Sequence, residues 1–153
     1  MTQTSEGRAR KIARRVALEQ AIARRSDKYA YSAKDYAEKL TQTKLKNTQV
    51  RGLETLAYAT DRVSAVIDWL KVRVGRDDKR NRWAQDGTGH DLLATLEGLQ
   101  RDARDIAVAI RKDYSMPKED SDLERQVHLR LIREYLKHLA AHFEYQKSEV
   151  GGE

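Results

Sequence analysis

The chain has 153 residues, enough for one domain with a hydrophobic core, and it has no cysteine, which excludes disulfides, a thiol nucleophile and cysteine-liganded zinc. Charged residues make up 35% of it and aromatic residues 7%, with one proline and eight glycines, so we expect long helices with solvated outer faces. No apolar run approaches the roughly 20 residues of a membrane span, and the basic N-terminus lacks the apolar core of a secretory signal. We therefore expect a cytoplasmic protein that does not enter a membrane.

The net charge of +6 is unevenly distributed along the chain. Residues 1–40 hold ten Lys/Arg and five Asp/Glu, residues 41–85 hold the same numbers, and residues 86–153 hold ten and fourteen. A basic front and an acidic back indicate a polyanion on one side and a protein neighbour, or a further copy of the chain, on the other. Charge simply scattered over a soluble surface is the alternative.

The first 40 residues form a basic segment in which we expect two helices. Residues 6–25 combine a narrow stripe of alanines and small apolar residues with seven cations: Arg8, Arg10, Lys11, Arg14, Arg15, Arg24 and Arg25. Such a helix can lie along a phosphate backbone, or on an anionic membrane surface, for which it lacks an anchoring Trp or Phe. The alternative is an ordinary first helix packed by its alanines. Ser26-Asp27 is the expected break and N-cap. Tyr29 and Tyr36 then share a face with Leu40, where their rings pack on the bundle or stack on unpaired bases.

Residues 47–74 have the clearest helical period and are expected to form one long helix. Apolar or small residues recur there at steps of three or four: Val50, Leu53, Ala57, Thr60, Val63, Ile67, Leu70 and Val74. Asn47 or Thr48 is a candidate N-cap, and Gly75 stands where a C-cap is expected. The outer face is basic and runs into a basic loop around Trp83, which either contacts nucleic acid or tucks its indole onto the bundle.

Two further helices complete the predicted fold. The first begins at His90 or Asp91 and repeats Leu92, Leu96, Leu99, Ala103, Ile106, Ile110 and Tyr114 on one face. The second begins at Ser121 and directs inward Val127, Ile132, Leu136, Leu139 and Phe143, flanked by Leu129 and Leu131. We predict an all-α bundle of about five helices, with residues 1–40 as a basic helical segment and residues 41–150 as a core domain whose three helices form the firm core.

The sequence offers little catalytic chemistry. His138 and His142 stand four apart on the last helix and could share a metal, but the glutamate of an HExxH motif is missing, and a surface pair is the commoner reading. We therefore expect a non-catalytic protein with no cofactor and no metal site. An enzyme would depend on this histidine pair.

Three short motifs resemble the small subunit of type III CRISPR effector complexes, of the Csm type. The first is the lysine-containing lead into Thr48-Gln49-Val50-Arg51. The second is the run 69–76, Trp-Leu-Lys-Val-Arg-Val-Gly-Arg, which is similar to the family's basic segment ending near Gly-Arg. The third is the alanine-rich end 139–147, in which histidine precedes the aromatic residue and lysine is displaced. The basic helix before Ser26 is longer than this pattern requires.

The resemblance implies a helical, non-enzymatic subunit of an antiviral ribonucleoprotein, repeated along its interior and touching the backbone of guide RNA and target RNA. Its partners would be those RNAs, other effector subunits and further copies of itself. The residues expected to contact RNA are Lys44, Lys46, Arg51, Arg62, Arg73, Arg76, Lys79, Arg80 and Arg82, with Arg14 and Arg15 as further candidates. A protein-interaction bundle such as an adaptor and a ribosome- or rRNA-associated four-helix protein are the alternatives.

Overall fold

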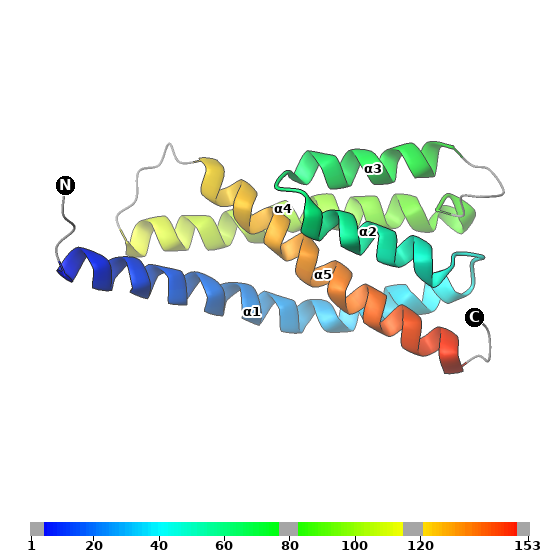
Figure 1. Ribbon diagram of the computed structural model, residues 1–153, viewed down its shortest axis with the longest axis horizontal. Helices are drawn as coiled ribbons and strands as arrows, with labels where there is room; N and C mark the ends of the chain where they lie inside the picture. Colours follow the sequence, from blue (N-terminus) through cyan, green and yellow to red (C-terminus); the bar gives the residue numbers. More distant parts are fainter. Residues whose placement is uncertain (1–4, 77–82, 115–120, 150–153) are drawn as a thin grey trace.

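The computed structural model describes residues 5–76, 83–114 and 121–149, and over these ranges it has five α-helices and no strand (Figure 1). The predicted all-α bundle is confirmed. In chain order the elements are α1 (Ser5–Thr41), α2 (Asn47–Ala59), α3 (Val63–Gly75), the short 3-10 helix η1 (Gln85–Gly87), α4 (Thr88–Asp113) and α5 (Ser121–Glu149).

Helix α5 lies at the centre of the bundle and crosses α1, α4 and α2 (Figure 1). A helix that packs on several neighbours must be apolar on more than one face. The buried residues of α5 accordingly include Leu129 and Leu131 as well as every residue predicted to point inward. They also include Tyr135, which the apolar pattern did not mark. Helix α5 is therefore the element on which the other helices pack.

The predicted break at Ser26-Asp27 is wrong, because α1 is one uninterrupted helix of 37 residues. Ser26 is buried, and its Oγ lies 2.9 Å from Nε2 of His138 on α5. A residue that would cap a helix start in isolation thus forms a tertiary hydrogen bond inside a helix. The C-terminal half of α1 contributes Tyr29, Tyr36 and Leu40 to the core, which therefore extends beyond the three helices expected to form it.

The prediction of one helix over residues 47–74 is also wrong. Helix α2 ends at Ala59, Thr60 has extended backbone angles, and α3 runs back antiparallel to α2 (Figure 1). The guanidinium of Arg133 on α5 explains the break, since its Nε donates to the carbonyl of Ala57 (2.7 Å) and its Nη2 to that of Thr60 (2.8 Å). The last carbonyls of α2 are thereby satisfied by a side chain instead of another helical turn.

The apolar period nevertheless identified the buried faces of both helices. Val50, Leu53 and Ala57 of α2 are buried, as are Ile67, Leu70 and Val74 of α3. Two of the predicted caps shift by a residue or more. Lys46, not Asn47 or Thr48, is the N-cap of α2, and Arg76 rather than Gly75 is the C-cap of α3. Helix α4 begins at Thr88, two or three residues before the predicted start at His90 or Asp91.

Candidate nucleic-acid interface

The loop between α1 and α2 holds Lys44 and Lys46 outward. Thr43 and Leu45 are buried while the lysines between and after them are exposed, which is the alternation of an extended segment. Hydrogen bonds fix this backbone: the Leu45 amide donates to Oγ1 of Thr43 (3.2 Å), and the Lys46 amide donates to Oε1 of Gln49 (3.0 Å). The two ammonium groups are therefore carried on a loop whose own backbone is held in place.

The C-terminal turn of α3 carries Arg73 and Arg76. The guanidinium of Arg73 lies 3.6 Å from the ring centroid of Trp69, one turn earlier, in a cation–π contact. Burial and the neighbouring charge of Arg76 both lower the pKa of Arg73 from its ordinary value. Arg76 is exposed. Trp69 is thus a support for Arg73 that the site prediction missed, although the i, i+4 spacing of the pair is visible in the sequence.

Residues 83–85 contact both of these basic segments. Only 1% of Trp83 is exposed, and its ring meets Trp69 edge-on with 6.3 Å between centroids, so the indole is tucked onto the bundle. Two residues later, Oε1 of Gln85 accepts a hydrogen bond from the Lys44 amide (3.1 Å). Because α2 and α3 form an antiparallel hairpin, the start of α2 and the end of α3 lie at the same end of the bundle (Figure 1).

We call the surface formed there the basic end, and it consists of Lys44, Lys46, Arg73 and Arg76. Among the described residues, neither lysine nor Arg76 forms an ion pair, and all three are exposed. A concentration of cations on a defined surface is the electrostatic footprint of a polyanion-binding site. The structure therefore brings together four of the eleven predicted site residues.

Arg51 and Arg62 do not join the basic end. Arg51 pairs with Glu144 on α5, whose hydrogen bond raises the pKa of Arg51, and this neutralises its charge locally. Arg62 is the N-cap of α3, beyond the 13 residues, or about 20 Å, of α2. There it lines a hollow of about 430 Å³ together with Asp61 and Asp122. The predicted continuous cationic face of one long helix does not exist.

The remaining candidates lie elsewhere. Arg14 is half-buried and Arg15 is exposed, both in the N-terminal half of α1. Lys79, Arg80 and Arg82 lie outside the described residues.

Two of the four histidines, His128 and His138, have structural partners in the described part of the chain. His128 is buried with its Nε2 2.9 Å from the Leu96 carbonyl, and His138 contacts Ser26. Over the described ranges, no three histidine or acidic side chains are placed to hold a metal ion. No helix in those ranges is long and apolar enough to span a membrane.

No family model, curated protein or solved structure matches the chain.

Proposed function

We propose that this chain is a non-catalytic RNA-binding subunit that holds the phosphate backbone of paired guide and target RNA at its basic end. The observation that carries the proposal is the convergence of Lys44, Lys46, Arg73 and Arg76 from two segments of the chain onto one end of the bundle. Each phosphate neutralised by such a cation releases condensed counterions, which drives binding without reading the base sequence.

The aromatic residues of the basic end support contact with the backbone rather than with bases. Stacking on a base requires an open aromatic face. Trp83 is buried, and Arg73 covers a face of Trp69. Arginine and lysine then remain as the groups that meet the ligand, and both suit phosphate oxygens.

The resemblance to Csm-type small subunits suggests the complex in which this chain acts, and we include that complex in the proposal. We propose that the chain is a cytoplasmic subunit of a type III CRISPR effector complex, where it contacts other effector subunits and further copies of itself. Within the Thr-Gln-Val-Arg opening, Gln49 bonds the N-cap amide, Val50 is buried and Arg51 pairs with α5. These motif residues position α2, and with it the loop that presents Lys44 and Lys46.

The experiment is to purify tagged protein from its native host and to identify the RNA and proteins bound to it. We expect short RNAs that share a repeat-derived end, together with larger effector subunits. A variant in which Lys44, Lys46 and Arg76 are changed to Gln should retain less RNA at the same salt concentration. Protein free of RNA would instead support an interaction bundle, and ribosomal RNA would support a ribosome-associated protein; either result contradicts the proposal.

A further inference from the structure

Two groups of basic residues lie on the side of α1 that faces α4, and neither belongs to the basic end. Each group has two adjacent cations and a third three positions later, and the second group repeats the first after 14 residues: Arg10, Lys11 and Arg14, then Arg24, Arg25 and Lys28. In an uninterrupted helix, 14 residues correspond to about 21 Å and close to a whole number of turns. Both groups therefore face the same side.

The first group lines a hollow of about 180 Å³ against the end of α4. Gly7 and Tyr114 complete its lining, and the lining includes no acidic residue among those described. The hydroxyl of Tyr114 donates to the carbonyl of Ala13 (3.2 Å), which ties the end of α4 to α1 at this point. The hollow is thus formed by three cations and a phenol ring, a combination suited to a small anion such as a phosphate group.

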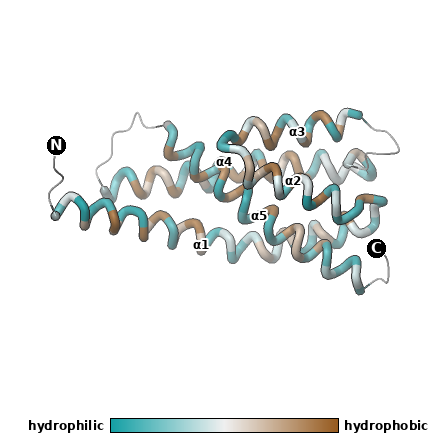
Figure 2. The backbone as a smooth tube through the Cα atoms, in the orientation of Figure 1, coloured by the Kyte–Doolittle hydropathy of each residue, from teal (hydrophilic) through white to brown (hydrophobic). Residues whose placement is uncertain are grey.

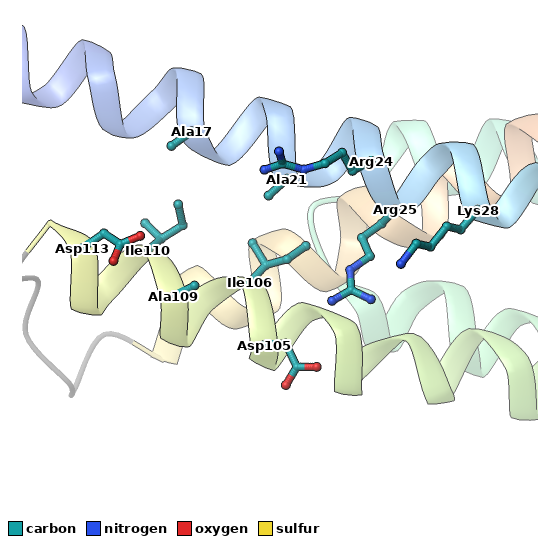
Figure 3. Close-up of a pocket in the computed structure, with 10 residues that line it drawn as sticks. All are labelled: Ala17, Ala21, Arg24, Arg25, Lys28, Asp105, Ile106, Ala109, Ile110 and Asp113. Atoms are coloured by element: carbon teal, nitrogen blue, oxygen red, sulfur yellow. The ribbon is translucent and has the colours of Figure 1, made fainter.

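The second group lines a hollow of about 380 Å³ between α1 and α4 (Figure 3). Its apolar lining consists of Ala17, Ala21, Ile106, Ala109 and Ile110. Nη1 of Arg25 donates to Oδ1 of Asp102 (3.2 Å), so Arg25 is engaged within the fold. Arg24 and Lys28 are exposed. Two carboxylates also line the hollow: that of Asp105 points away from α1, and Asp113 lies at the end of α4 beside Ala17 (Figure 3).

We propose that this side of α1 is a second binding surface, which takes the phosphate backbone of a single RNA strand. We call it the α1 seam, and it consists of Arg10, Lys11, Arg14, Arg24 and Lys28. The distance of about 21 Å between the two groups is long enough for several consecutive phosphates of one strand to lie along the helix. The alanines between the groups leave room for the strand to approach the helix.

The α1 seam is separate from the basic end. Lys28 precedes the end of α1 by 13 residues, or about 20 Å, and Lys44 follows that end. All five seam residues are Arg or Lys, which contact phosphate oxygens, so we expect little base preference, although Tyr31, 78% exposed, lies one turn beyond Lys28. The evidence for the α1 seam is the two hollows and the 14-residue repeat of basic residues. It does not require the basic end to bind RNA.

The test measures binding of a fluorescein-labelled polyuridine strand of about 20 nucleotides by anisotropy over a salt series. Two variants each remove two seam charges: Arg10→Gln/Arg14→Gln and Arg24→Gln/Lys28→Gln. The matched control is Lys34→Gln/Lys39→Gln, which removes two exposed charges from the same helix away from both hollows. Circular dichroism verifies that all variants keep the wild-type helix content.

We expect each seam variant to lower affinity about tenfold more than the control and to reduce the salt slope by about 1.4, since each single-strand contact contributes about 0.7. The same effects should persist when Lys44 and Lys46 are both changed to Gln. Equal losses in the seam and control variants would overturn the inference while leaving the basic end untouched. Displacement of the RNA by polyglutamate at an equal charge concentration would overturn it too, because the seam would then prefer an acidic protein.

Discussion

The two halves of α1 share one backbone conformation but have very different surroundings. From Ile22 onward the helix buries a regular series of side chains against α4 and α5, whereas no described residue before Ile22 is buried. In the first half even Ile12 and Val16 are 63% and 49% exposed. Figure 2 shows hydrophilic residues over most of that half, with scattered hydrophobic ones. A continuous helix can thus be anchored by one half and display charge on the other.

The polar contacts of the two halves of α1 also differ in how deeply they are buried. In the second half, Tyr29 donates to Oδ2 of Asp102 on α4 (2.7 Å), and burial together with this hydrogen bond raises the pKa of the phenol. In the first half, Glu19 accepts two hydrogen bonds from Arg130 on α5, where the two side chains are 51% and 37% exposed. Exposed pairs of this kind contribute about 0–1 kcal/mol, so the anchored half provides most of the stability.

The sharpest test of this difference compares two aliphatic truncations. Leu40→Ala removes a side chain of the C-terminal half of α1 that is 0% exposed, and it should lower the free energy of unfolding by about 2–5 kcal/mol because it leaves a cavity. Ile12→Ala removes a similar volume from the exposed half and should change it by less than about 0.5 kcal/mol. Urea titration followed by circular dichroism measures both. Similar losses would show that the N-terminal half of α1 is also packed in solution.

A second comparison concerns two arginines of α5. Arg133→Met leaves the carbonyls of Ala57 and Thr60 without their donor, and it should cost about 1–3 kcal/mol. Arg130→Met breaks only the exposed pair with Glu19 and should cost at most about 1 kcal/mol. Urea titration ranks the two variants. The reverse ranking would mean that the turn between α2 and α3 does not depend on α5.

Two glycines of α4, one closely packed and one in open space, allow the same substitution to be compared in two surroundings. A Cβ at Gly89 would lie 2.1 Å from the Trp83 carbonyl oxygen and 2.5 Å from Cγ2 of Val74, so Gly89→Ala should cost about 1–3 kcal/mol. A Cβ at Gly98 meets nothing within 4 Å, so Gly98→Ala should stabilise the helix by about 0.5–1 kcal/mol. Thermal melts should shift in opposite directions. A stable Gly89→Ala variant would mean that Trp83 does not pack closely on α4.

The smallest predicted effect concerns pH and His138. Burial, with Lys137 and His142 nearby, lowers the pKa of this imidazole, while Glu134 opposes the shift. The folded state therefore binds the proton less readily than the unfolded state, and stability should fall as pH drops below the ordinary histidine pKa of about 6.5. His138→Gln should flatten the dependence of the unfolding free energy on pH between about 7 and 5.5. An unchanged slope would assign the dependence to other groups.

The sequence predicted which residues are buried far better than where helices end. The periods of α4 and α5 gave correct inward faces because burial repeats with the helix itself. The ends of α2 and the continuity of α1 depend on Arg133 and His138, which act from 76 and 112 residues away in the sequence. Thr60–Arg62 contains no Pro or Gly, so the local signal for that turn is weak: it consists of Thr60 and Asp61, and Oγ1 of Thr60 accepts from the Arg62 amide (3.2 Å).

The sequence predicted which residues form the candidate site but not how they are arranged in space. Lys44, Lys46, Arg73 and Arg76 were all named, but Lys44 and Lys46 were placed before the start of one long helix and Arg73 and Arg76 at or beyond its far end. The four side chains lie at one end of the bundle because α2 and α3 form a hairpin. The apolar pattern predicted a single helix there, so it could not predict this arrangement. The repeat on α1 was visible in the sequence, but the hollows beside it required the position of α4.

The salt dependence of RNA binding is the measurement that tests whether the basic end holds phosphate backbones. The measurement compares the wild-type chain with Lys44→Gln/Lys46→Gln and with the control Lys34→Gln/Lys39→Gln on a duplex RNA. We predict steep salt dependence for the wild type, with a slope that falls by about two in the first variant and little in the control. An affinity that stays constant over a several-fold rise in salt, or equal slopes in all three proteins, would contradict the claim.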